Sequence, residues 1–172
     1  GGMIALINQK ENIINAVLNI SKLQIANINS NKQIILSGKE KLIKIALDFC
    51  KLKKIKAIQI PVSGAFHSKL MDPASDTLLE KINQLNFNDA KILLYQNFDG
   101  LPYMDKALIK KNLVKQINSP VLWKNCITNM IKDGASSFIE VGPKNVLSSI
   151  NKSINANVKS NSFENLLSNE SI

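Results

Sequence analysis

The residues best suited to acid–base chemistry lie in one short stretch, residues 61–71, with the sequence Pro-Val-Ser-Gly-Ala-Phe-His-Ser-Lys-Leu-Met. It contains His67, the single histidine of the 172-residue chain. A histidine side chain has an unperturbed pKa of about 6.5, which lets it take up and return a proton near neutral pH. His67 is therefore the candidate general base, and a structural imidazole with satisfied hydrogen bonds is the alternative.

The rest of the chain offers His67 no recognisable nucleophile. Ser37 and Ser63 each precede a glycine, but neither stands in the Gly-x-Ser-x-Gly pattern of a nucleophile elbow. A glycine-rich phosphate loop is absent as well. Cys50 and Cys126 are far apart and have no second ligand nearby, so no metal site is predicted and both thiols are expected to be reduced. The residues alone predict a base without a nucleophile.

Composition excludes some partners and favours others. The net charge is +9, from 22 basic and 13 acidic residues, and every basic residue is lysine. Proteins that bind specific nucleic acids depend on arginine and on stacked aromatic rings, whereas aromatic residues make up only 5% here. An acidic protein partner fits the charge better. For these reasons no nucleic acid is predicted as a partner. No apolar run reaches the roughly 18 residues of a membrane span, so no membrane is predicted as a partner either.

The elements that must position His67 begin with residues 1–60, where strand and helix patterns alternate. Strands are predicted at residues 3–8, 23–28, 33–36 and 55–60, and helices at residues 11–20 and 39–53. The polar turn at residues 29–32 joins two of the strands as a hairpin. The order βαββαβ is typical of a ferredoxin-like small subdomain with a half-buried sheet.

Residues 61–152 alternate differently and predict a layered α/β unit. Helices are expected at residues 73–85, 121–132 and 145–150, and strands at residues 91–96 and 137–141, the second of a buried type. A further helix is expected after Asp105, with Leu108, Ile109, Leu113 and Val114 as its apolar residues. Asp72 and Asp105 are expected to be N-caps. Asp72 and Asp76 share a helix face near His67, where capping and surface charge explain them more simply than chemistry does.

The two ends of the chain lead to separate expectations. From Asn151 the sequence is rich in Asn and Ser and loses periodicity, which predicts a mobile tail over residues 153–172 with a single turn near residues 163–167. The chain opens on Gly1 and runs straight into an apolar strand, and residues 61–152 have too few strands for a sheet of their own. Both features predict a fragment of a larger protein.

Several stretches, taken in order, resemble the acyltransferase family, in particular malonyl-CoA:acyl carrier protein transacylases. The stretch around His67 is similar to the family's Pro-Val-Ser-x-x-Phe/Ser-His-Ser-x-Leu-Met motif. Further similar stretches are residues 1–3, 27–33, 97–100, 116–123 and 140–143. The resemblance covers residues 1–152 and departs at Asn31, where the family usually has proline, and at Lys144, where it often has glycine.

The resemblance implies an acyl transfer through a malonyl-serine intermediate, with His67 as general base. The backbone carbonyl of Gln116 would orient the imidazole, and the serine would precede Gly1 in the parent protein. Phe66 resembles the residue that narrows the acyl pocket, and a core aromatic under the loop is the alternative. The expected substrate-binding residues are Asn27, Asn29, Ser63 and Phe66. The implied fold is a ferredoxin-like subdomain followed by the C-terminal part of an α/β-hydrolase-like large subdomain.

The same resemblance implies malonyl-CoA and acyl carrier protein as partners, no cofactor, a monomer, and a location in the bacterial cytoplasm or a plastid-type organelle. An acyltransferase domain of a polyketide synthase is a second enzyme hypothesis, disfavoured because the end of the chain does not resemble a linker. A non-catalytic ferredoxin-like module that docks an acidic protein partner is the alternative outside enzymes, since dispersed lysines serve either function.

Overall fold

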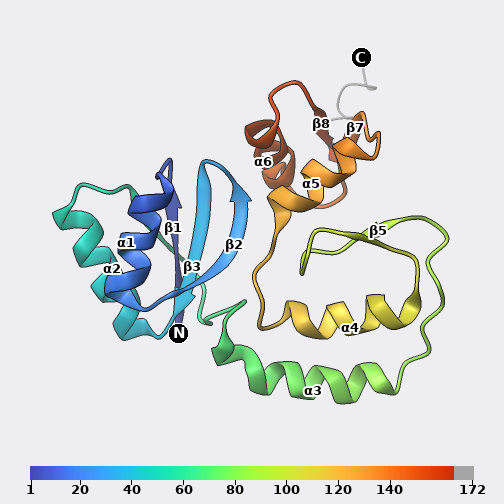
Figure 1. The fold of residues 1–172 in the computed structure, drawn as a ribbon, viewed down its shortest axis with the longest axis horizontal. Coiled ribbons are helices and arrows are strands. Elements are labelled where there is room, and N and C mark those ends of the chain that lie inside the picture. The colour runs from blue at the N-terminus through green and yellow to red at the C-terminus, as the bar shows by residue number, and fades with distance from the viewer. Residues whose placement is uncertain (165–172) are drawn as a thin grey trace.

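The first part of the molecule is a four-stranded sheet with two helices. The computed structural model describes residues 1–164 (Figure 1). Its first elements are β1 (Gly2–Ile7), α1 (Glu11–Ser21), β2 (Gln24–Ser30), β3 (Gln33–Gly38), α2 (Glu40–Leu52) and β4 (Ala57–Ile60). The strands lie in the order β2-β3-β1-β4, and every neighbouring pair is antiparallel. The predicted order of elements over residues 1–60 is therefore confirmed.

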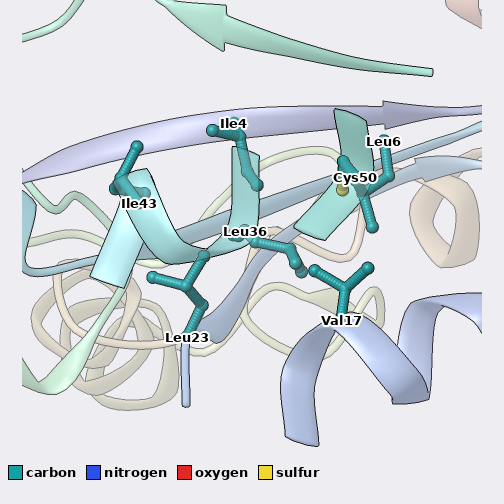
Figure 2. Close-up of a cluster of buried hydrophobic side chains, with 8 residues drawn as sticks. Ile4, Leu6, Val17, Leu23, Leu36, Ile43 and Cys50 are labelled. Carbon is teal, nitrogen blue, oxygen red and sulfur yellow. The ribbon is translucent and has the colours of Figure 1, made fainter. Parts of the chain in front are cut away.

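The two faces of this sheet have different partners. Because side chains alternate along a strand, Ile4 and its cross-strand partner Leu36 point to the same side as Leu6. Figure 2 shows these side chains packed against Val17 of α1 and Ile43 of α2. The opposite face carries a smaller apolar cluster, formed by Met3, Ala5, Ala26 and Ile35 with Ile7 and Ile60 at its margin. That second face is the one available for a binding site.

The second part consists mainly of helices with short strands. Its elements are the 3₁₀ turn η1 (Lys69–Met71), α3 (Asp72–Asn83), β5 (Leu94–Tyr95), β6 (Pro102–Tyr103), α4 (Lys106–Gln116), α5 (Trp123–Lys132), β7 (Ser137–Glu140), α6 (Val146–Ile154) and β8 (Lys159–Ser162). Figure 1 shows α3 and α4 running side by side, and the two helices are in contact. In the described part of the chain no helix combines the length and the apolar content that crossing a bilayer requires.

The two predicted N-caps have different outcomes. Asp105 caps α4 as expected, since its Oδ1 accepts a hydrogen bond from the backbone N–H of Leu108 at 2.8 Å. The prediction for Asp72 is wrong, because Asp72 is the first residue of α3 and Met71 precedes it without a side-chain cap. The 3₁₀ turn η1 leads directly into α3, so the helix begins one residue earlier than the proline suggested.

Both strands predicted for the second part differ from the expectation. The strand at residues 91–96 is reduced to Leu94–Tyr95, and its partner strand contains Pro102, which has no N–H to extend the ladder. The strand at residues 137–141 forms as β7, but it is not buried within the described residues. Ile139 is 58% exposed and Val141 is 82% exposed, because β7 is paired with β8 alone.

The tail predicted after Asn151 is wrong up to residue 162. Helix α6 continues to Ile154, and β8 pairs in parallel with β7. Strand β8 has the alternating burial of a half-buried strand, but its inward residues are Ser160 and Ser162. Serine in both inward positions hides the period of two from a hydropathy pattern. The turn expected at residues 163–167 lies mostly outside the described residues.

Candidate functional site

His67 is held in an unusual backbone conformation on the loop between β4 and η1. Its φ angle is +58°, in the left-handed region that few residues other than glycine adopt. A conformation of this kind costs on the order of 1–3 kcal/mol and persists only where the surroundings enforce it. The buried Ser68 does so, since its hydroxyl donates to the carbonyl of Ala65 at 2.6 Å and accepts from the N–H of Leu70 at 3.3 Å.

One hydrogen bond decides which nitrogen of His67 is available for chemistry. Nδ1 of His67 lies 2.9 Å from the backbone carbonyl oxygen of Gln116. A carbonyl oxygen can only accept, so Nδ1 must carry the proton of the neutral ring. Nε2 then keeps a lone pair, and none of the described residues forms a hydrogen bond with it. The ring is therefore in the tautomer that a general base requires.

The carbonyl of Gln116 is positioned by the sheet as well as by its own helix. Gln116 is the last residue of α4, and the chain beyond it runs along β2. The N–H of Ile28 donates to the carbonyl of Val121 and the N–H of Val121 donates to the carbonyl of Ala26, both at 2.8 Å. This short parallel bridge lies at Asn27. It fixes the end of α4 against the strand that carries the candidate polar residues.

A cleft of about 500 Å³ lies over the sheet face that α1 and α2 leave free, and we call it the sheet cleft. Its polar lining consists of His67, Asn27, Asn29 and Gln33, and its apolar lining of Met3, Ala5, Ile7, Ile35, Ile58, Ile60, Phe66, Val146 and Ile150. No cationic side chain of the described residues is in this lining. The arrangement provides one base on the wall of a largely apolar groove, and a mostly apolar lining with a few polar groups is typical of a small-molecule site.

The structure brings most of the predicted site residues together. His67, Phe66, Asn27 and Asn29 all line the sheet cleft, and Gln116 contributes through its backbone. The side-chain amide of Asn29 donates to Oε1 of Gln33 at 2.7 Å. Ser63 is the exception, because it is exposed and is not among the residues that line the cleft.

Val146 and Ile150 of α6 form a further part of the cleft lining, and neither residue was predicted from the sequence to belong to the site. Their spacing of one helical turn is the signal that was available. Glu140 anchors this helix, as its carboxylate accepts from the N–H groups of Leu147 at 3.1 Å and Ser148 at 2.8 Å. Desolvation alone would raise the pKa of Glu140, but these hydrogen bonds outweigh it and lower that pKa below its ordinary value.

Neither the two cysteines nor the acidic side chains of the described residues provide a nucleophile or a metal site. Burial, together with the charge of Asp99, raises the pKa of the Cys126 thiol to about 11. Burial also raises the pKa of Cys50. Both thiols therefore stay protonated near neutral pH and are poor nucleophiles. Within residues 1–164 no three His, Cys, Asp or Glu side chains are grouped closely enough to bind a metal ion.

Replacing Ser68 with alanine should weaken the site without touching the imidazole. The change leaves the buried carbonyl of Ala65 without its donor, at a cost of about 1–3 kcal/mol, and frees the loop that enforces the left-handed conformation of His67. We expect a lower urea midpoint and a weaker His67–Gln116 hydrogen bond. Ser149→Ala is the control, since that exposed hydroxyl donates to the carbonyl of Asn145 one turn earlier and not to the loop that carries His67. Equal effects of the two variants would contradict this role for Ser68.

Comparisons with known proteins agree on one family. The acyl transferase domain matches residues 1–166. The malonyl CoA-acyl carrier protein transacylase of Bacillus subtilis (strain 168) is 38% identical over 137 residues, which are 79% of this chain and 43% of that protein. The protein of the same name from Staphylococcus aureus (strain COL) is 40% identical over 142 residues, 82% of this chain and 46% of that one. The chain thus spans less than half the length of these curated relatives.

Solved structures give the same result for the fold. The malonyl CoA-acyl carrier protein transacylase of Clostridium perfringens Atcc 13124 superimposes with a TM-score of 0.89 at 31% identity, covering 98% of this chain and 57% of that one. The Coxiella burnetii transacylase also gives a TM-score of 0.89, at 30% identity, with 98% and 56% covered. The mixed α/β fold of this chain matches the fold of these proteins.

Proposed function

Since this chain belongs to the acyl transferase domain family, we propose that the whole protein transfers a malonyl group from CoA to the phosphopantetheine thiol of acyl carrier protein. The observation that carries the proposal is the His67–Gln116 hydrogen bond at the wall of the sheet cleft. It leaves Nε2 free to accept a proton beside a largely apolar cleft. His67 is the proposed general base, and Gln116 is the proposed orienting residue.

The proposed reaction has two steps, acylation of a serine by malonyl-CoA and transfer of the malonyl group to the carrier protein. In the first, a serine outside these 172 residues gives its proton to Nε2 of His67 while its oxygen bonds to the malonyl carbonyl carbon. The bond from that carbon to the CoA sulfur then breaks, and the departing thiolate takes the proton from His67. In the second half the carrier protein's thiol gives its proton to His67 and its sulfur attacks the malonyl-serine ester. The serine oxygen leaves and regains the proton.

A neutral carbonyl at Nδ1 is sufficient for this chemistry. Triads that cleave amides hold the imidazole with a carboxylate, which stabilises the imidazolium formed during the reaction. A thioester is already activated toward acyl transfer, so a weaker stabilising group is expected to serve. The carbonyl of Gln116 still fixes the tautomer and the plane of the ring, and these are its proposed contributions.

Substrate contacts within the described residues are proposed for Asn27, Asn29 and Phe66, all of which line the sheet cleft. Asn27 and Asn29 are proposed to bind polar groups of the substrate arm. Phe66 is proposed to limit the size of the acyl group beside His67. The cleft lining contains no cationic side chain among the described residues, so the malonyl carboxylate is proposed to be bound by a group outside them. Ser63 is left out of this proposal.

The remaining features of the proposal follow from the same resemblance. Residues 1–60 would form a ferredoxin-like small subdomain, and residues 61–152 the C-terminal part of an α/β-hydrolase-like large subdomain. The observed strand order β2-β3-β1-β4 supports the first assignment. We further propose a monomer that needs no cofactor and acts in the bacterial cytoplasm or in a plastid-type organelle.

The test is an assay of the full-length protein with malonyl-CoA and acyl carrier protein, in which mass spectrometry follows the carrier. Malonyl-carrier protein should accumulate, and without carrier the protein itself should gain one malonyl group. A second reaction with acetyl-CoA measures acyl selectivity. A protein that binds the acidic carrier but transfers no acyl group would overturn the proposal in favour of a non-catalytic docking module.

A further inference from the structure

A second side-chain contact joins the two segments that the His67–Gln116 hydrogen bond connects. The side-chain amide of Asn118 donates to Oδ1 of Asp72 at 2.7 Å. Asp72 is the first residue of α3, shortly after His67, and Asn118 closely follows Gln116 at the end of α4. The two hydrogen bonds therefore close a small ring through both segments, with the base and its orienting carbonyl on one side.

The segment that carries Asn118 is tied to Gln116 by its own hydrogen bonds. The side-chain amide of Gln116 donates to the carbonyls of Ser119 at 3.1 Å and Pro120 at 3.4 Å. The hydroxyl of Ser119 donates to Oδ1 of Asn118 at 3.2 Å, which leaves the Asn118 amide pointing its N–H toward Asp72. Residues 116–120 thus form a compact turn. A displacement of Asn118 is therefore expected to displace the backbone carbonyl of Gln116 as well.

The contact between Asp72 and Asn118 is suited to fixing a distance. Both residues are half-buried, so the bond is partly shielded from water. A carboxylate acceptor makes a hydrogen bond shorter and stronger than a neutral one. A second link, from the hydroxyl of Ser75 to the carbonyl of Val114 at 3.1 Å, keeps α3 and α4 in register one turn further along. Of these two links between α3 and the segment containing α4, the Asp72–Asn118 bond is the one made to the turn that follows Gln116.

We propose that Asp72 and Asn118 are positioning residues, whose hydrogen bond holds the Gln116 carbonyl against Nδ1 of His67. The proposal rests on the proposed transferase function, because it assigns the pair to the orientation of the proposed base. Neither residue touches the cleft, so they act through Gln116 and His67 alone. Loss of the contact lets the turn shift, which weakens the bond to Nδ1 and leaves the imidazole free to change plane or tautomer.

The test compares variants of the full-length protein by kinetics and by NMR of the His67 ring. Asp72→Ala and Asn118→Ala should each lower kcat of malonyl transfer about 10-fold with little change in KM, since a misplaced base affects the transition state and not substrate binding. The double variant should lose no more than either single variant, because both remove the same contact. Asp76→Ala is the matched control, as Asp76 is exposed on the next turn of α3 and its carboxylate makes no hydrogen bond with any of residues 1–164.

If an alanine variant does not fold, two further variants that keep the size of the side chains test the same contact. Asn118→Asp places two carboxylates at the contact and should lower kcat at least as far as Asn118→Ala. Adding Asp72→Asn to it restores a donor and an acceptor in reversed order and should recover kcat to within about twofold of wild type. Recovery in the swapped pair would show that the contact itself, and not either side chain alone, sustains kcat, whereas no recovery in a folded swapped pair would contradict the proposal.

The NMR measurement separates this proposal from the proposed function. In ¹⁵N-histidine-labelled protein, with His67 assigned by its loss in His67→Ala, the hydrogen-bonded Nδ1–H should give a distinct resonance. That resonance should shift or broaden in Asp72→Ala and Asn118→Asp, and return in the swapped pair. This result supports the positioning role even if the protein transfers no malonyl group. An unchanged Nδ1–H resonance in the folded variants would overturn it, whatever the activity.

Discussion

Replacing His67 with alanine in the full-length protein is expected to lower kcat of malonyl transfer by about 10²–10⁴-fold, the contribution typical of a general base. The reason is the geometry of the ring. Nδ1 is committed to the carbonyl of Gln116, and Nε2 is the nitrogen left for proton transfer beside the cleft. KM for malonyl-CoA should change little, because the apolar lining of the cleft remains in place.

Two further measurements decide whether that loss reflects proton transfer. Imidazole added to the His67→Ala variant should restore part of the activity, because the space left by the ring opens on the sheet cleft. The malonyl-protein intermediate should also form more slowly in the variant, since the base acts in both halves of the reaction. Turnover that is unchanged in a folded His67→Ala protein would rule out the base role and leave the histidine with a structural one.

The sequence was sufficient for the elements whose pattern is local. The short apolar, β-branched runs in β1 and β3 and the helical spacing of apolar residues in α2 predicted these elements, because each of these patterns is set by its own residues. Asp105 was predicted as a cap for the same reason, since an N-cap bonds within its own turn. The family motif placed His67 and Gln116, and their contact is present at 2.9 Å.

The features that could not be predicted from the sequence depend on contacts between residues far apart in the chain. Strand β8 exists because β7 lies beside it and Asn151 donates to Ser160, and neither fact can be read from an Asn- and Ser-rich stretch. The contact between Asp72 and Asn118 requires α3 and α4 to lie side by side. Asp72 taken alone looked like a helix cap. Its chemical interest appears only once the turn after α4 is in place.

The sheet connects stability with function because one of its faces forms the hydrophobic core and the other lines the sheet cleft. Residues on one face of β1 and β3 pack against α1 and α2, and the residues between them line the cleft. Leu36 and its neighbour Ile35 illustrate the division, since Leu36 points into the core and Ile35 into the cleft. A substitution on the core face should therefore also affect the site, although none of the residues of that buried cluster lines the cleft.

Replacing Leu36 with alanine is expected to lower the free energy of unfolding by about 2–5 kcal/mol, which is the range for a buried leucine that leaves a cavity. Leu36 is fully buried and lies opposite Ile4 in the centre of the cluster in Figure 2. The fixed backbone of a central strand leaves its neighbours little freedom to close the space. Urea denaturation followed by far-ultraviolet circular dichroism measures the loss, as a lower midpoint at an unchanged slope.

Leu52→Ala is the matched control, because it removes the same atoms from the last residue of α2, where the side chain is 76% exposed. Its effect should stay within about 0.5 kcal/mol, as for other surface substitutions. Leu36→Met keeps most of the volume and should cost less than about 1.5 kcal/mol. If Leu36→Ala and Leu52→Ala destabilised the protein equally, the packing of α1 and α2 on this face would not be what holds the sheet. The cleft on the opposite face would then need another support.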